Sequence, residues 1–245
     1  MKILVLFDID GTILKLKDDL SRIIFKKILK KIFGRDIENE HLPDFSGVTD
    51  MFIIKEIARR ADFPFEILDE EFDAIWENLH TDFEIHCNNE NIRIMPGITE
   101  LLERMHKDNS FILGLVTGNF KQNAYLKLRH CNFDKYFTFG AFGSDNEDRN
   151  ILPPIAIQRA NEIFGIDLFS NENTLIIGDS PNDIKCAKAN NIPVISVATG
   201  HFTSDILKEY YPDYLMKDLS NAATVIKTIH NHFNSVPHEK NNYSN

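Results

Sequence analysis

The chain has 245 residues, 43% of them hydrophobic and 26% charged, which suits one large domain or a core domain with a smaller one. Its formal net charge of −10 disfavours nucleic acid and anionic membrane surfaces as partners, because an acidic protein repels both. Three scattered cysteines without a CxxC pair, no signal-peptide core and no apolar run of membrane-spanning length lead us to expect a cytoplasmic protein without disulfides or zinc.

The first predicted element is a strand over residues 3–7, a continuous apolar run that leads into the sequence DIDGT at residues 8–12. Such a run indicates a strand buried on both faces that feeds a functional loop. Asp8 and Asp10 would repel each other at this strand end, and a divalent cation would neutralise them. Their hard oxygen ligands suit Mg²⁺. The alternative is a simple turn, in which Asp and Gly are common.

The next segment, from about residue 14 to residue 94, has helical patterns and no good strand. An apolar stripe ending at Gly34 predicts its first helix. We therefore expect an all-helical cap domain, residues 15–94, inserted after the first strand, with Pro96 and Gly97 marking the return to the core. The predicted helices span residues 20–32, 50–61 and 69–83.

Strands and helices alternate through the rest of the chain, which indicates a parallel sheet with helices on both faces. The fold class is thus α/β, a Rossmann-like parallel sheet flanked by helices, with the helical cap inserted. The core domain is predicted to cover residues 1–14 and 95–233, and the polar tail 234–245 to be disordered. The predicted strands are 111–116, 174–177 and 193–197, and the predicted helices are 98–106, 122–130, 154–164 and 182–189.

A second acidic pair follows the strand at 174–177, in the sequence GDSPND at residues 178–183. Ligands of such sheets bind at the carboxyl ends of the strands, so this pair is expected near the first one. Asp179 can complete a Mg²⁺ shell, and Asp183 can bind a metal-bound water or orient Asp179. A helix N-cap at Ser180 explains part of the segment but not both carboxylates.

Two further signals are weak when taken singly. Thr117, Gly118 and Asn119 end another strand, where a hydroxyl and backbone N–H groups can hold phosphoryl oxygens, although a simple turn is the commoner explanation. Arg149 precedes the proline-containing helix and could offset negative charge at Asp8, although an arginine beside an aspartate is more often a surface ion pair.

The motif set DIDGT, VTGN, a basic residue before a proline-containing helix, and GDSPND resembles the four motifs of the haloacid dehalogenase superfamily. The order and strand contexts match over about residues 3–220. The helical insert resembles the subgroup with a helical cap, which includes phosphoglycolate phosphatase-like enzymes. The resemblance implies a Mg²⁺-dependent phosphatase that hydrolyses small phosphomonoesters through an aspartyl-phosphate intermediate.

The resemblance also implies residue roles. Asp8 would be the nucleophile, and Asp10 would protonate the leaving oxygen and later activate water, with its backbone carbonyl on the metal. Asp8, Asp10, Asp179 and Asp183 would form the Mg²⁺ site, and Thr117, Gly118 and Asn119 would bind the phosphoryl group. The chain departs from the family at the third motif, where a lysine is usual. Arg149 is the best match there, because Arg159 falls inside the predicted helix.

The second aspartate of the first motif separates this chain from dehalogenases and ATPases of the same fold, which lack it. Two alternatives stay open: a phosphomutase of the β-phosphoglucomutase type, and a non-catalytic binding protein that keeps the fold. The substrate, and monomer versus homodimer, are not fixed by the sequence.

Residues 45–47 are a candidate loop near the site. The cap cations Arg35, Lys55, Arg59 and Arg60 are candidates for binding a substrate anion, although a solvated helix surface explains each of them better.

Overall fold

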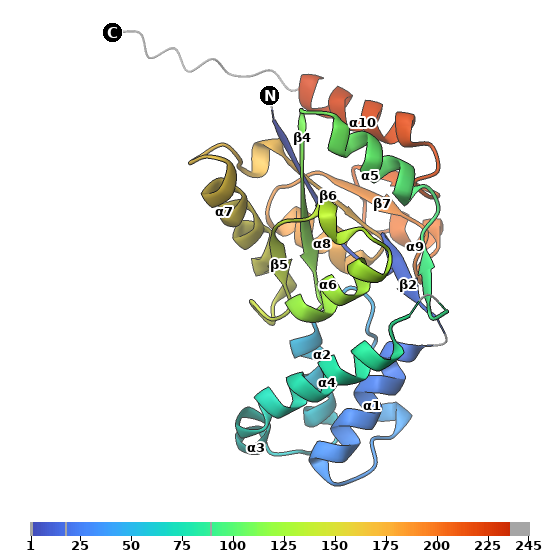
Figure 1. Ribbon diagram of the computed structural model, residues 1–245, viewed down its shortest axis with the longest axis vertical. Helices are drawn as coiled ribbons and strands as arrows, with labels where there is room; N and C mark the ends of the chain where they lie inside the picture. The colour runs from blue at the N-terminus through green and yellow to red at the C-terminus, as the bar shows by residue number, and fades with distance from the viewer. Residues whose placement is uncertain (1, 18, 89, 236–245) are drawn as a thin grey trace.

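The computed structural model describes residues 2–17, 19–88 and 90–235, and its centre is a six-stranded parallel sheet of order β5-β4-β1-β6-β7-β8 (Figure 1). The central strand β1 pairs with β4 and β6, so that Phe7 lies beside Leu115 on one side and Ile177 on the other. The predicted Rossmann-like sheet is confirmed. Its strands are β1 (Ile3–Phe7), β4 (Phe111–Thr117), β5 (Gly140–Phe142), β6 (Thr174–Gly178), β7 (Val194–Val197) and β8 (Tyr214–Met216).

Helices cover both faces of the sheet, and the side chains of β1 alternate between two apolar cores. Val5 and Phe7 belong to the core shared with α5 and α10, whereas Leu4 and Leu6 pack in the core shared with α7 and α8. Burial on both faces explains why the strand reads as an unbroken apolar run. The helices of this layer are α5 (Ile98–Lys107), α6 (Lys121–His130), α7 (Leu152–Phe164), α8 (Pro181–Ala189), α9 (Ser204–Lys208) and α10 (Ala222–Ser235).

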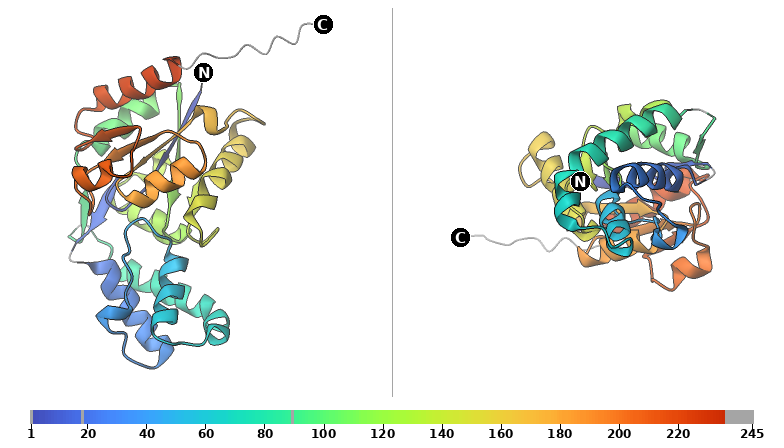
Figure 2. Two further views of the ribbon diagram at one scale, coloured as in Figure 1. Left: turned by 180° about the vertical axis from the view of Figure 1, so that it is seen from behind. Right: turned by 90° about the horizontal axis from the view of Figure 1, so that it is seen from below.

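A group of helices lies beyond the carboxyl ends of the strands, where Figures 1 and 2 show it beneath the sheet. It contains α1 (Leu20–Phe33), α2 (Asp50–Arg60), α3 (Phe65–Glu70) and α4 (Phe72–His86). We call residues 15–94 the cap, keeping the predicted boundaries as a working definition. Helix α1 ends at Gly34, which adopts the left-handed conformation with φ of 66° that favours glycine.

The cap departs from its prediction in two places. Residues 14–94 do contain strands: β2 (Leu14–Leu16) and β3 (Ile92–Ile94) form an antiparallel ribbon where the chain leaves and re-enters the sheet domain. Three-residue strands are too short for an alternating pattern to reveal. The helix predicted over 69–83 is in fact two helices, α3 and α4, separated by a turn at Glu71.

The other differences lie near the sheet edges and the chain end. The edge strands β5 and β8 have three residues each and carried no clear signal, and α9 and α10 were not predicted. Helix α10 runs through Ser235, so the tail predicted at 234–245 begins inside a helix, and its residues 236–245 lie outside the described part of the chain. Among the described residues, no helix has the length and apolar character needed to cross a membrane.

Candidate active site

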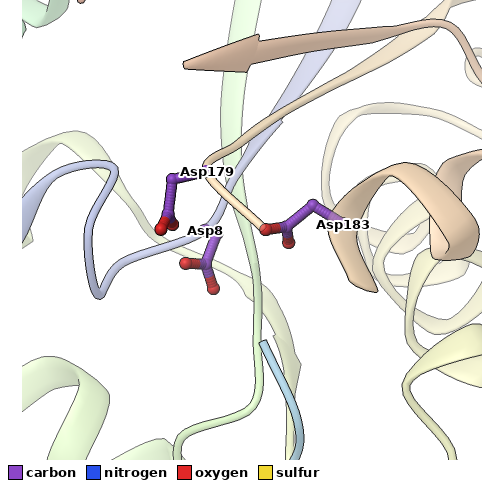
Figure 3. A group of neighbouring side chains, drawn as sticks. All are labelled: Asp8, Asp179 and Asp183. Atoms are coloured by element: carbon purple, nitrogen blue, oxygen red, sulfur yellow. The ribbon is translucent and has the colours of Figure 1, made fainter. Parts of the chain in front are cut away.

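Three aspartates meet at the carboxyl end of the sheet (Figure 3). Asp8 directly follows β1, Asp179 directly follows the neighbouring strand β6, and Asp183 lies in the first turn of α8. One carboxylate oxygen from each lies within 4.8 Å of the others, and all three side chains are buried. The parallel pairing of β1 with β6 therefore brings together residues that are 171 positions apart in the sequence.

A helix cap fixes Asp183. The Ser180 hydroxyl accepts a hydrogen bond from the Asp183 N–H, and Asp183 Oδ2 accepts from the Ser180 N–H at 3.0 Å and from its hydroxyl at 2.7 Å. Pro181 occupies the first turn, where its missing N–H costs nothing. The N-cap interpretation and the acidic-site interpretation of this segment are compatible, because the cap uses Asp183 Oδ2 and leaves Oδ1 to contact Arg149.

Arg149 is the cation of this cluster. It begins the short 3-10 helix η3 (Arg149–Ile151), and its Nη2 donates to Asp8 Oδ1 at 2.9 Å and to Asp183 Oδ1 at 2.5 Å. Although burial lowers the pKa of Arg149, the carboxylates of Asp183 and Asp8 raise it well above its ordinary value, so the guanidinium is charged. Arg159, the weaker sequence candidate, pairs with Asp145 instead.

Negative charge remains in excess at the cluster. Burial, followed by the charge of Asp183, raises the pKa of Asp8 to about 7, even though Arg149 opposes the shift. Burial and the neighbouring carboxylates likewise raise the pKa of Asp179 well above its ordinary value. Three buried carboxylates with one guanidinium leave a site that a divalent cation would stabilise.

Space at the cluster is kept open by glycine. A side-chain carbon on Gly11, whose φ of 93° also favours glycine, would overlap the Asp179 carboxylate, and so would one on Gly200. Thr12 donates to Asp179 Oδ1 at 3.1 Å and holds the carboxylate in this space. Hard oxygen donors, excess negative charge and backbone without side chains fit a cation such as Mg²⁺ at Asp8, Asp179 and Asp183.

Asp10 lies apart from this cluster and is held by two other residues. Lys127 Nζ donates to both carboxylate oxygens of Asp10, at 2.9 and 2.8 Å, and Asn119 Nδ2 donates to Asp10 Oδ2 at 2.7 Å. Asn119 also contacts Thr117 Oγ1 through Nδ2, at 2.8 Å, and accepts from Lys127 at 2.6 Å. In this structure the Asn119 side chain, predicted to bind phosphate, is occupied with Asp10.

Lys127 is a functional candidate that the sequence analysis missed. The helical period of α6 could have drawn attention to it, because positions 120, 124, 127 and 128 share one face of the helix. The other three residues on that face, Phe120, Ala124 and Leu128, are fully buried. A lysine on an apolar face is unusual, since lysine is almost never fully buried without a partner.

Seven of the eight predicted site residues line one cavity of about 290 Å³. Asp183 is the exception, because it lies behind Arg149 against Ser180. The cavity is also lined by cap residues, including 44–48, which contain the predicted loop 45–47. The predicted residues around it are Asp8, Asp10, Thr117, Gly118, Asn119, Arg149 and Asp179.

The cap contacts the core beside this cavity. The Asp50 N–H donates to the Gly118 carbonyl at 2.8 Å, and the Ser46 carbonyl accepts from Asn182 Nδ2 at 2.9 Å. Gly118 has no room for a side chain, because the Val48 carbonyl lies directly against it. The loop before α2 is therefore pressed onto two of the loops that carry site residues.

The four cap cations singled out in the sequence do not line the cavity. Lys55 pairs with Glu147 at 2.6 Å, Arg59 and Arg60 pair with Glu56, and Arg35 donates to the Ala61 carbonyl. Arg22 and Lys15 line the cavity instead. The orientation of α1 and of the β2–β3 ribbon decides which lysines and arginines face the cavity. The amino-acid composition of the cap does not predict this orientation.

The buried carboxyl group of Asp50 should make the free energy of unfolding depend on pH. Burial raises its pKa to about 7, against the opposing charge of Lys127, while Oδ2 accepts from the Phe120 N–H at 2.8 Å. A carboxyl whose pKa is raised on folding costs stability as pH rises from its unfolded value near 4 to about 7.

Asp50→Asn removes this titration but keeps an oxygen to accept from Phe120. We expect the variant to gain roughly 2 kcal/mol in free energy of unfolding, relative to the wild type, between pH 5 and pH 8. Urea unfolding of both proteins at the two pH values measures this. A difference that stays constant with pH would contradict the assignment of the shift to Asp50.

A sequence model described as haloacid dehalogenase-like hydrolase matches residues 5–197, which is most of the chain. The chain belongs to this family. The recognition made from the four motifs is confirmed. The predicted enzyme class, a phosphoric monoester hydrolase that resembles phosphoglycolate phosphatases, is confirmed as well.

Two relatives illustrate the similarity. Pyrophosphatase PpaX of Oceanobacillus iheyensis is 23% identical over 225 residues, covering 91% of this chain and 95% of the relative. A phosphoglycolate phosphatase of Vibrio parahaemolyticus is 24% identical over 224 residues, with 91% and 95% covered.

Solved structures share the fold. The crystal structure of a predicted phosphoglycolate phosphatase from Haemophilus somnus 129pt superimposes with a TM-score of 0.67 at 21% identity, covering 92% of this chain and 98% of that one. CbbY from Rhodobacter sphaeroides, in complex with phosphate, also gives 0.67, at 20% identity and 90% and 96% coverage. A candidate beta-phosphoglucomutase from Thermotoga maritima gives 0.58, at 19% identity and 93% and 99% coverage. At these identities the similarity concerns the fold alone.

Proposed function

We propose that the chain is a Mg²⁺-dependent phosphatase that hydrolyses small phosphomonoesters through an aspartyl-phosphate on Asp8. The observation that carries the proposal is the placement of the Asp8 carboxylate: at the end of the central strand, on the wall of the cavity, and 2.9 Å from the Arg149 guanidinium. The family match and the phosphatase and pyrophosphatase relatives support the same conclusion.

In the first step, a carboxylate oxygen of Asp8 attacks phosphorus and the bond from phosphorus to the leaving oxygen breaks. Asp10, also on the cavity wall, gives a proton to that oxygen. In the second step, water attacks the phosphorus of the aspartyl-phosphate and Asp10 takes its proton. Inorganic phosphate leaves and Asp8 is restored as the carboxylate.

Positioning and charge neutralisation are the main requirements of phosphoryl transfer. Arg149 supplies positive charge at Asp8, and its Nη2 contacts the carboxylates of Asp8 and Asp183. Asp8, Asp179 and Asp183 would hold Mg²⁺, which would neutralise charge between the nucleophile and the phosphoryl group. Thr117 and Gly118 line the cavity beside them as the proposed phosphoryl contacts.

The substrate is proposed to be a small phosphorylated metabolite in the cytoplasm. A cavity of about 290 Å³ that the loop 44–48 helps to enclose suits a small ligand. The three cysteines are free, and Cys87 and Cys186 are buried, as suits a reducing compartment. We expect the enzyme to act without nucleic acid or membrane partners, as a monomer or homodimer.

A phosphate-release screen tests the proposal. The panel holds pyrophosphate, phosphoglycolate, sugar phosphates and nucleotides, each with Mg²⁺ and with EDTA, and the Asp8→Asn variant prepared in parallel is the control. We expect release with Mg²⁺ from at least one small substrate, loss of release with EDTA and recovery when Mg²⁺ is added back. No release from any substrate would favour a non-catalytic protein, and interconversion of hexose phosphates without net release would favour a mutase.

A further inference from the structure

Lys127 is a lysine inside the protein, next to the proposed acid–base residue. Its side chain is 2% exposed, yet its ammonium group makes contacts of 2.9 and 2.8 Å to Asp10 and 2.6 Å to Asn119 Oδ1. Burial lowers the pKa of Lys127, but the charges of Asp10 and Asp50 outweigh this and raise it, so the ammonium group is charged. All three of its hydrogen bonds end on residues of the proposed site.

The cap completes the surroundings of Lys127. Phe83 of α4 places its ring centroid 5.5 Å from the ammonium nitrogen, and the buried Asp50 at the start of α2 interacts with it electrostatically. Cys87, the third cap residue near the ammonium group, is a neutral thiol, because burial raises its pKa to about 11. One lysine of the core is thus enclosed by the acid–base residue on one side and by the cap on the other.

We propose that Lys127 is a positioning residue that holds the Asp10 carboxylate toward the leaving-group side of the cavity, in a setting that the seated cap completes. The inference rests on the proposed phosphatase function. Asp10 is 38% exposed in its side chain, so without a fixed partner its carboxylate would be free to rotate into solvent. Two hydrogen bonds from one ammonium group and one from Asn119 fix both of its oxygens.

A purely structural ion pair explains these contacts less well. A buried pair adds little net stability, because removing two charges from water costs about as much as their attraction returns. An apolar side chain could fill the same space beside Phe83. The positive charge of Lys127 is therefore better explained by its hydrogen bonds to Asp10 than by a contribution to the stability of the fold.

The test compares two substrates in Lys127→Met. Phenyl phosphate needs a proton on its leaving oxygen, whereas 2,4-dinitrophenyl phosphate does not. A mispositioned acid should lower kcat/KM for phenyl phosphate by roughly 10- to 100-fold and change it little for the dinitrophenyl ester. Lys121→Met is the matched control, since Lys121 is an exposed lysine of the same helix, and it should leave both values unchanged.

A double-mutant cycle with Asp10→Asn separates positioning from direct action. If Lys127 acts through Asp10, Lys127→Met should cost nothing further with phenyl phosphate once Asp10 is asparagine, while in the Lys121→Met background it should cost its full factor. Lys127→Arg, which keeps the charge and the donors, should recover much of the phenyl phosphate activity. If the methionine variant does not fold, Lys127→Gln takes its place in the same assays.

Equal losses with both esters, or a full further loss in the Asp10→Asn background, would overturn the proposal. Either result would leave the phosphatase function standing, provided that Asp8→Asn is inactive. Activity that survives Asp8→Asn would instead reject the proposed function, whatever Lys127 does.

Discussion

Replacing Asp8 by asparagine is expected to lower kcat by roughly 10⁴-fold or more, because the proposed mechanism begins with attack of the Asp8 carboxylate on phosphorus beside Arg149. The asparagine amide has the same shape but is not a nucleophile. Arg149 keeps its contact with Asp183, so the cluster retains a paired cation.

Asp8→Asn should also fold at least as well as the wild type. Burial raises the pKa of Asp8 to about 7, so the charged carboxylate costs free energy in the native structure. Asparagine is uncharged and removes this cost. Thermal unfolding at pH 7.5 should give an equal or higher Tm, alongside the lost phosphate release. Near-normal turnover by a clean preparation would show that Asp8 is not the nucleophile.

The second large effect is expected for Asp10→Asn. Asparagine can neither give a proton to the leaving oxygen nor take one from water, so kcat/KM for phenyl phosphate should fall by roughly 10²- to 10⁴-fold. The dinitrophenyl ester needs no acid, so its kcat/KM should change far less. Its kcat should still fall, because hydrolysis of the aspartyl-phosphate lacks its base.

Rapid-quench kinetics with the dinitrophenyl ester distinguishes these two steps. In Asp10→Asn we expect a burst of dinitrophenol followed by slow turnover, because the first step outpaces the second. The wild type serves as the reference at the same enzyme concentration. A variant that loses both esters equally, without a burst, would contradict the acid–base role of Asp10.

The sheet and its acidic residues were readable from the sequence because both depend on local pattern. β1 and β6 are buried on both faces, so each appears as an apolar run, and the residue that follows each run lies at the carboxyl edge of the sheet. That rule places Asp8 and Asp179 at the same edge of the sheet, and the pairing of β1 with β6 makes them neighbours. Arg149 needed the fold as well, since its contact with Asp8 joins η3 to the end of β1.

The side-chain contacts between cap and core were not predicted, because they depend on how two separately patterned units meet. Lys127 was missed for this reason: the period of its helix is compatible with burial, but its partners Asp10, Asn119 and Phe83 come from three other segments. The loop 45–47 was expected near the site, and it does line the cavity. The ribbon of β2 and β3 shows a different limit, since strands of three residues give no periodic signal.

The measurement closest to the central claim is chemical trapping of the intermediate. The enzyme is quenched in acid during turnover of 2,4-dinitrophenyl phosphate with Mg²⁺, reduced with borohydride, and its peptides are sequenced by mass spectrometry. An acyl phosphate on Asp8 is reduced to homoserine, so we predict homoserine at position 8 and at no other aspartate, with none in samples lacking substrate. Full turnover with an unmodified residue 8, or homoserine at position 10 or 179 instead, would contradict nucleophilic attack by Asp8.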